Sequence, residues 1–285
     1  MPEKIDSHLS TPLPQKLYHY TSTESFRCIV EYNKLWATDA FYMNDNQEIL
    51  HALELCQEVC RSMVKGASDR EREFLEKLFN ELHFQKTNQT HVFTVSFSES
   101  RDQLSQWRAY TRNGGYALAF KGGALSHVAN GQGYLIAKCI YEETLKKELI
   151  NEFISNKLHE STTAPDIDLL AVIAANDFLI IAAMMKHQGF SEEKEWRLIS
   201  TTSRDDPSQI KYRSVARYLI PYLEVSVSPK VMPRIDSRRF IGIDEVLVGP
   251  APEPELSWRS CMQLLIDRDI YFEQITPSGT PYRAN

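Results

Sequence analysis

Acidic residues crowd the start of one predicted strand, in the segment Ser191-Glu192-Glu193-Lys194-Glu195-Trp196-Arg197. Side chains of a strand alternate between its two faces, so Glu193, Glu195 and Arg197 are predicted to share one face, opposite Trp196. Neighbouring carboxylates repel each other, which raises the pKa of at least one of them. The pattern is typical of a site that stabilises a cation or accepts a proton.

A histidine stands between two aromatic residues and next to a hydroxyl-rich turn, in Tyr18-His19-Tyr20-Thr21-Ser22. The imidazole of His19 can exchange hydrogen bonds with a sugar or phosphate. The same pattern also fits a histidine that bonds the backbone inside a sheet. On another predicted strand, Ser96 and Ser98 share one face. Their hydroxyls either order a carboxylate or ligand amide, or mark an exposed strand end.

Other residue patterns favour structural roles. Asp45 and Glu48 fit a helix N-cap closed by an acid one turn later. Cys56 and Cys60 are spaced as a buried helical stripe, and no CxxC pair supplies the rest of a metal site, so no metal is expected. The sequence contains no Gly-x-Ser-x-Gly elbow, Walker A loop or GxGxxG stretch.

The elements that must position these residues are strands and helices in irregular order. Strands are predicted at residues 17–20, 35–38 and 91–97, and the acidic strand follows a helix at about 166–186. Two helices between about 45 and 86 are predicted to form an αα-hairpin insertion. Because the order is not a regular βαβ repeat, we predict an α+β fold with a mixed or antiparallel sheet.

Size and composition limit the possible classes of protein. The chain has 285 residues, of which 42% are hydrophobic, and we predict a single domain at 16–285 after a flexible leader at 1–15. The net charge of −6 is unlike the basic field of a non-specific nucleic-acid binder. Five cysteines argue against a disulfide scaffold. With no signal peptide and no membrane-length apolar run, we predict a cytoplasmic protein without a membrane partner.

Taken in order, the motifs of this chain resemble DUF2971, a bacterial family of uncharacterised proteins, over about residues 16–283. The pieces that carry the resemblance are Leu17-Tyr18-His19-Tyr20-Thr21, Leu35-Trp36, Asn44-Asp45 with Glu48, Ser96-Phe97-Ser98, Gln106-Trp107-Arg108-Ala109-Tyr110, Gly115-Tyr116-Ala117-Leu118-Ala119-Phe120, Lys186, Phe190 to Arg197, Val248-Gly249-Pro250 and Pro281-Tyr282-Arg283.

The opening of the chain is also similar, more loosely, to ADP-ribosyltransferases. That resemblance implies NAD held in a cleft between two parts of a split sheet, with His19 on the ribose and Glu195 at the chemistry. Ser96-x-Ser98 and Glu193-x-Glu195 look like the Ser-Thr-Ser strand and paired glutamates of one subclass. Members of that subclass carry Arg on the first strand, where this chain has His19.

The ADP-ribosyltransferase resemblance also implies a division of roles. Glu195 stabilises the positive charge that grows on the ribose, and Glu193 deprotonates the incoming nucleophile. Either Trp36 or Tyr20 stacks on the nicotinamide. The residues expected to bind NAD are His19, Tyr20, Thr21, Trp36, Ser96, Ser98 and Arg197.

We therefore expect an NAD-dependent ADP-ribosyltransferase that modifies a protein or nucleic acid, in the manner of a bacterial toxin or defence effector. Two alternatives stay open. One is a binding module that senses a nucleotide without turnover, in which the acidic strand forms salt bridges with Arg197 and Lys194. The other is a metal-assisted nuclease or phosphoesterase that uses Asp45, Glu48 and the acidic strand.

Overall fold

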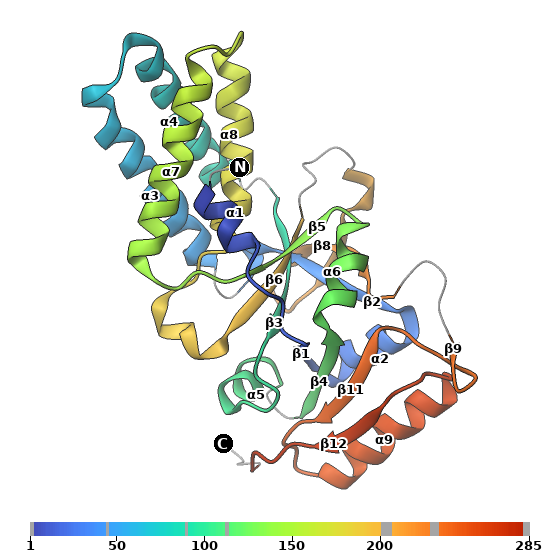
Figure 1. The fold of residues 1–285 in the computed structure, drawn as a ribbon. Helices are drawn as coiled ribbons and strands as arrows, with labels where there is room; N and C mark the ends of the chain where they lie inside the picture. The colour runs from blue at the N-terminus through green and yellow to red at the C-terminus, as the bar shows by residue number, and fades with distance from the viewer. Residues whose placement is uncertain are drawn as a thin grey trace.

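The computed structural model describes residues 3–43, 46–88, 91–111, 114–200, 207–228 and 234–281. These residues form a mixed α+β domain, as predicted, with a cluster of helices at one end and a large sheet at the other (Figure 1). The helices are α1 Glu3–Leu9, α2 Thr23–Tyr32, α3 Asn46–Met63, α4 Asp69–Asn88, α5 Leu104–Tyr110, α6 Gly122–Asn130, α7 Glu143–Ser161, α8 Ile167–Ala182 and α9 Pro254–Asp267. The strands are β1 Lys16–Ser22, β2 Lys34–Asp39, β3 Phe93–Ser98, β4 Gly115–Lys121, β5 Tyr134–Lys138, β6 Glu195–Ser200, β7 Lys211–Ser214, β8 Leu219–Ser226, β9 Arg234–Ile235, β10 Arg238–Arg239, β11 Ile243–Val248 and β12 Gln274–Pro277.

The main sheet of the described residues has ten strands and branches at β3. Its principal path runs β12-β11-β4-β1-β3-β2-β8-β7, and β6 joins β3 to β5 away from that path. The pair β11–β12 is parallel, whereas the pairs made by β3 are antiparallel. The prediction of a mixed sheet is therefore confirmed.

The two edges of β3 are occupied differently. On one edge, β6 pairs with residues 94–98 without a break. The other edge is shared, because β1 pairs only where Tyr18 meets Ser98, and β2 pairs only at Phe93 and Thr94. A strand has only two edges, so the middle of β3 has no strand beside it on the shared edge. The sheet splits there, and β1 and β2 diverge from each other.

Two packed layers hold this split sheet in place. Apolar side chains of the strands pack with α2, α6 and α9 in one core, which includes Phe97 and Trp196. On the other side, α3, α4, α7 and α8 form a helical cluster with its own core (Figure 1). The predicted αα-hairpin of α3 and α4 is therefore one half of a larger helical layer, to which α7 and α8 contribute the rest.

The first residues of the described chain correct one prediction. We expected a flexible leader at 1–15, but residues 3–9 form helix α1. Its Ile5 is 1% exposed and belongs to the core of the helical layer. The Lys4 Nζ lies 2.6 Å from Glu148, and the His8 Nε2 lies 2.8 Å from the Lys138 backbone oxygen. One apolar side chain anchors the helix, which is too short for a hydrophobic period to show in the sequence.

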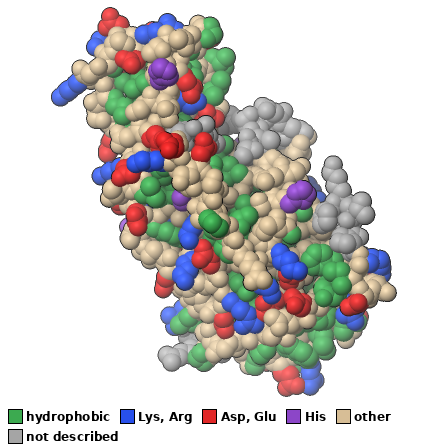
Figure 2. Space-filling view, viewed as in Figure 1, with side chains coloured by type: hydrophobic (Ala, Val, Ile, Leu, Met, Phe, Trp, Pro, Cys, Tyr) green, Lys and Arg blue, Asp and Glu red, His purple; other side chains and the backbone are tan. Residues whose placement is uncertain are grey.

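Charged side chains are spread over one face of the molecule. On the face drawn in Figure 2, basic and acidic side chains of the described residues are interspersed. No helix in the described ranges has both the length and the apolar character needed to span a membrane.

Candidate functional site

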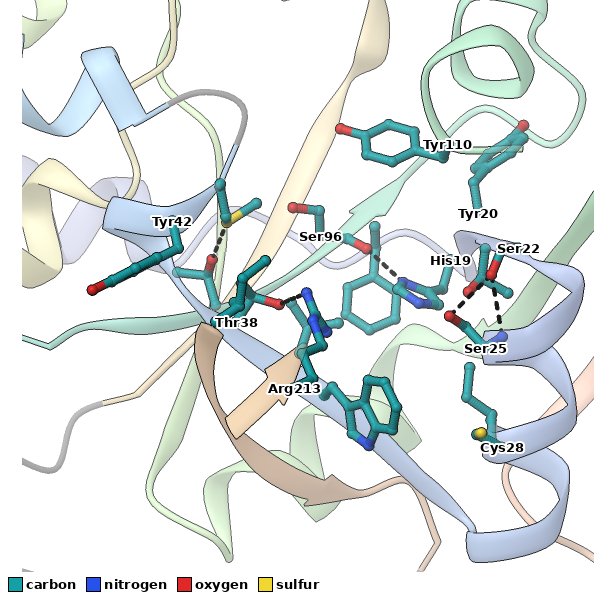
Figure 3. Close-up of a pocket in the computed structure, with 18 of the residues that line it drawn as sticks. His19, Tyr20, Ser22, Ser25, Cys28, Thr38, Tyr42, Ser96, Tyr110 and Arg213 are labelled. Carbon is teal, nitrogen blue, oxygen red and sulfur yellow. Dashed lines mark hydrogen bonds between the residues drawn. The ribbon is translucent and has the colours of Figure 1, made fainter. Parts of the chain in front are cut away.

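A hollow of about 440 Å³ lies at the split edge of β3. Val95, Ser96 and Phe97 line it from the unpaired part of that strand, and further walls come from β1, β2, α5 and the β7–β8 hairpin (Figure 3). Its volume lies within the roughly 300–1,000 Å³ that is usual for small-molecule sites. Because the hollow lies at an open strand edge, side chains from both faces of the sheet reach it.

The structure brings most of the predicted site residues to this hollow. Those that line it are His19, Tyr20, Thr21, Trp36, Ser96, Glu193 and Glu195. Ser98 on β3 and Arg197 on β6 do not line it, and both are buried. The roles of all these residues in binding or chemistry stay predictions, but the presence of His19, Glu193 and Glu195 in the lining of one hollow is a finding.

His19 is oriented by a bond to the neighbouring strand. Its Nδ1 lies 2.9 Å from the backbone oxygen of Ser96. A carbonyl oxygen only accepts, so Nδ1 carries the proton and Nε2 of the neutral ring is an acceptor. Burial lowers the pKa of His19, which keeps the ring neutral, although the bond to Ser96 partly opposes this. The structure thus shows a backbone-bonded histidine that keeps one nitrogen for another partner.

The two predicted serines have different surroundings. The Ser96 Oγ is buried and forms no hydrogen bond with another described residue, although Ser96 lines the hollow. A buried hydroxyl without a partner is unfavourable unless a ligand or water satisfies it. Ser98, in contrast, donates to the backbone oxygen of Glu193 at 2.7 Å and accepts from the Ser100 N–H at 3.0 Å. Ser98 therefore holds the acidic segment in place.

Tyr20 and Trp36 already have partners. The Tyr20 hydroxyl donates to the Ser100 backbone oxygen at 2.7 Å, and its ring meets the edge of Trp107 with a centroid distance of 4.7 Å. Trp36 packs on Tyr222 at a centroid distance of 4.9 Å. Each ring is fixed by these contacts while one part of it still lines the hollow.

The acidic segment differs from the predicted alternating strand. Glu193 ends the 3-10 turn Gln188–Glu193, and β6 begins at Glu195. Lys194 between them is left-handed, with φ of 45°, which interrupts the extended backbone that alternation requires. The two carboxylates nevertheless meet at one cation. The Lys186 Nζ donates to Glu193 Oε2 at 2.7 Å and to Glu195 Oε2 in a shorter bond.

Arg197 completes the pairing of Glu195. Its Nε donates to Glu195 Oε1 at 2.6 Å, and its Nη1 donates to the Ala183 backbone oxygen at 2.9 Å. Burial alone raises the pKa of Glu195, but the charges of Arg197 and Lys186 outweigh burial and lower it to about 2. A rise in pKa was predicted for at least one of the neighbouring carboxylates, and Glu195 is not the one that shows it. Its second cation is Lys186, which precedes the strand in sequence, and not Lys194.

Comparison with known proteins bears on one part of the chain. Residues 106–198 match the model of a family described as protein of unknown function (DUF2971). The predicted family is thereby confirmed for this segment. No curated protein and no solved structure matches the chain. The DUF2971 segment runs from α5 to β6, so it includes the acidic pair Glu193 and Glu195, whereas His19 and Ser96 precede it.

A second hollow lies behind the acidic pair. It has a volume of about 850 Å³, and both Glu48 and Lys186 line it. The Glu48 Oε1 accepts from the backbone N–H of His187 at 2.9 Å, and its Oε2 lies 3.9 Å from the Arg197 Nη2. The ion cluster thus separates the two hollows. Asp45, which the nuclease alternative also uses, lies outside the described residues. In the described ranges, no group of three or more His, Cys, Asp or Glu is placed to hold a metal ion.

Sequence reasoning missed several residues of the first hollow. Gln106, in the DUF2971 segment, is 5% exposed and lines the hollow, and its side-chain amide bonds no other described residue. Its place in the Gln106-Trp107-Arg108-Ala109-Tyr110 motif was a usable signal. Lys34 and Arg213 also line the hollow. Lys34 and Arg213 lie just beyond the predicted strands, and single basic residues there give no signal of their own, because only pairing across strands brings them together.

Proposed function

We propose that the hollow at the split edge of β3 binds NAD, and that the protein transfers ADP-ribose to a macromolecular acceptor. The observation that supports this is the meeting of His19 and Glu195 in one hollow of suitable size, although they lie far apart in the sequence. The ADP-ribosyltransferase resemblance requires such a meeting, and solid packing between the two side chains would have removed its basis.

The free polar groups of the hollow suit a ribose. The Ser96 Oγ is buried without a partner among the described residues, and the neutral ring of His19 offers Nε2 as an acceptor. A sugar hydroxyl both donates and accepts, so it matches this combination. Ser96 and His19 are connected through the backbone oxygen of Ser96, which fixes their relative position.

Glu195 carries the chemical step in this proposal. The bond between the nicotinamide nitrogen and C1′ of the ribose breaks, and its electron pair leaves with nicotinamide. The carboxylate of Glu195 stabilises the positive charge that grows at C1′. Its lowered pKa of about 2 keeps it ionised at neutral pH. The acceptor then forms a bond to C1′ and gives its proton to Glu193, the second carboxylate at the wall.

Release of nicotinamide tests the proposal directly. Wild type is incubated with labelled NAD and cell extract, and both free nicotinamide and labelled macromolecules are measured. Glu195→Gln is expected to abolish release while NAD still binds in calorimetry. Glu245→Gln is the matched control, because Glu245 is a buried carboxylate held by Arg101 at 2.8 Å and Lys16 at 3.3 Å outside the hollow.

The control separates chemistry from folding. Both variants lose a buried carboxylate with two cationic partners, so circular dichroism and thermal unfolding show whether each variant still folds. Nicotinamide release that persists in Glu195→Gln, or that is absent from wild type, contradicts the enzyme proposal.

One observation favours a second candidate, a nucleotide-sensing module without turnover. Glu195 is committed to two cations in a buried cluster, so part of its charge is already compensated. In that case wild type binds NAD with a measurable affinity, and neither nicotinamide nor a labelled product forms.

A further inference from the structure

Basic side chains as well as acidic ones line the hollow, and Arg213 and Lys34 form its cationic wall. Arg213 on β7 lines it, and no described residue forms an ion pair with Arg213. Among the described residues, its side chain forms one hydrogen bond, from Nη2 to Thr38 Oγ1 at 2.9 Å. A guanidinium has five N–H donors and stays charged in proteins, so the described residues satisfy only a small part of its hydrogen-bonding capacity. Arg197 shows the contrast, because its Nε binds a carboxylate at 2.6 Å.

Aromatic rings hold the Arg213 side chain in position. Its Cζ lies 5.5 Å from the ring centroid of Trp36 and 6.0 Å from that of Tyr222. Contact with ring faces favours a guanidinium and orients its plane. Burial lowers the pKa of Arg213, with a small opposing effect of Tyr222, so its charge lacks part of the solvation it has in water. Figure 3 shows Arg213 and His19 entering the hollow from different strands.

Lys34 extends this wall along β2. Lys34, Trp36 and Thr38 alternate with buried residues of β2, so they share the face that lines the hollow. Lys34 also has no ion pair with a described residue. The carboxylate across from Trp36 is Glu224, and it binds Lys211 at 2.8 Å. Glu224 therefore pairs with Lys211 and not with a cation of the wall.

Resting on the proposed function, we propose that Arg213, with support from Lys34, binds the diphosphate of the dinucleotide. A guanidinium can bind two phosphate oxygens at once, which gives direction as well as energy. The diphosphate is negative, so it matches Arg213 and Lys34, which form no ion pair with a described residue. The carboxylates of Glu193 and Glu195, in contrast, are already paired with Lys186 and Arg197.

Calorimetry with three probes tests this assignment. The probes are NAD, ADP, which keeps a diphosphate, and nicotinamide riboside, which has no phosphate. For Arg213→Gln we expect about a tenfold or greater loss of affinity for NAD and ADP, as for a lost charged hydrogen-bonding partner. Affinity for nicotinamide riboside is expected to stay unchanged. Arg217→Gln is the control, because Arg217 is an exposed arginine of the same hairpin outside the hollow.

The outcomes separate this inference from the proposed function. If NAD binds wild type and Arg213→Gln equally well, the diphosphate site is wrong while NAD binding stands. If wild type binds ADP through Arg213 but not NAD, the diphosphate site stands and the proposed function is wrong. Failure of wild type to bind either probe overturns both.

Further variants keep the test decisive if Arg213→Gln does not fold. Arg213→Lys keeps the charge but loses two-oxygen binding, so it should show a partial loss for NAD and ADP. Lys34→Gln should weaken the same two probes by a smaller factor. Unchanged affinities in both variants overturn the diphosphate site.

Discussion

The imidazole Nδ1 of His19 on β1 donates to the backbone oxygen of Ser96 on β3 at 2.9 Å, across the split in the sheet. The strands pair nearby only where Tyr18 meets Ser98. A side chain thus provides a contact between β1 and β3 where the backbone ladder is interrupted, and it places an imidazole beside an unpaired hydroxyl.

Protonation of His19 is expected to weaken NAD binding. Its pKa is lowered from 6.5 by burial, so the ring stays neutral at neutral pH and loses its Nε2 acceptor only under acid conditions. We predict that affinity falls as the pH drops below 6.5 and that His19→Ala removes this dependence. The free energy of unfolding should also fall below this pH, because the unfolded chain binds the proton more readily than the folded chain. Calorimetry over a pH series measures the affinity, with replacement of the exposed His127 of α6 by alanine as the control.

Replacing the two serines should separate binding from folding. Ser96→Ala removes a hydroxyl that has no partner among the described residues, so stability should change by less than about 0.5 kcal/mol. Affinity for NAD should fall about fivefold, the effect of one neutral hydrogen bond. Ser98→Ala breaks bonds with Glu193 and Ser100, so it should destabilise by about 1–3 kcal/mol. Urea unfolding measures the stabilities and calorimetry measures the affinities. Equal stabilities and equal affinities of the two variants would contradict this prediction.

Glu195 should make stability depend on pH in the acid range. A lowered pKa means that its contribution is present above 4.5 and is lost as the pH falls toward about 2. Because one pKa unit corresponds to about 1.4 kcal/mol, that contribution is roughly 3 kcal/mol. The difference in unfolding free energy between wild type and Glu195→Gln should therefore shrink with acidification. Urea titrations at several pH values measure it, and a constant difference would disprove the assignment.

Removing the buried cation shared by Glu193 and Glu195 should destabilise the protein more than removing a partly exposed cation of another ion pair. Lys186→Met leaves Glu193 and Glu195 buried without their common partner. Loss of one member of a buried ion pair costs about 3–5 kcal/mol. Lys138→Met is the comparison, because Lys138 pairs with Glu99 at 2.9 Å with about a third of its side chain exposed. Equal thermal stabilities of the two variants would argue against the cluster.

Helix α1 should behave as part of the folded domain. Ile5 is 1% exposed in the core of the helical layer, so Ile5→Ala is expected to cost about 2–5 kcal/mol. Glu3→Ala on the exposed side of α1 should have little effect. Differential scanning calorimetry measures the stability of both variants. An unchanged stability of Ile5→Ala would favour the original prediction of a flexible leader.

Local patterns in the sequence predicted much of the fold. The aromatic and β-branched run that became β3, and the helical periods of α3 and α8, were visible without tertiary information. The burial of Trp196 opposite Glu195 also followed from alternation. Residue order could not show that β3 pairs with β1, β2 and β6, because strand pairing is set by contacts distant in sequence.

The candidate site was predictable to a similar degree. His19, Ser96 and Glu195 were found by residue type and resemblance, and all three line one hollow. The pairing of Lys186 with Glu195 was not predicted, because the chain turns back between these two residues and no sequence pattern indicates that turn. Arg213 was missed for the same reason, since its role depends on Trp36 and Thr38 from another strand.

Lys194 shows how much depends on one backbone conformation. With φ of 45°, it turns the chain between Glu193 and Glu195, so their spacing in sequence does not measure their spacing in the fold. Glycine or asparagine would tolerate this position, whereas valine or isoleucine would be strained. Inserting or deleting a single residue here would rotate one acid away and leave the ammonium of Lys186 with a single counter-ion. The electrostatic balance behind the pocket is therefore vulnerable to a change in chain length that alters no charged residue.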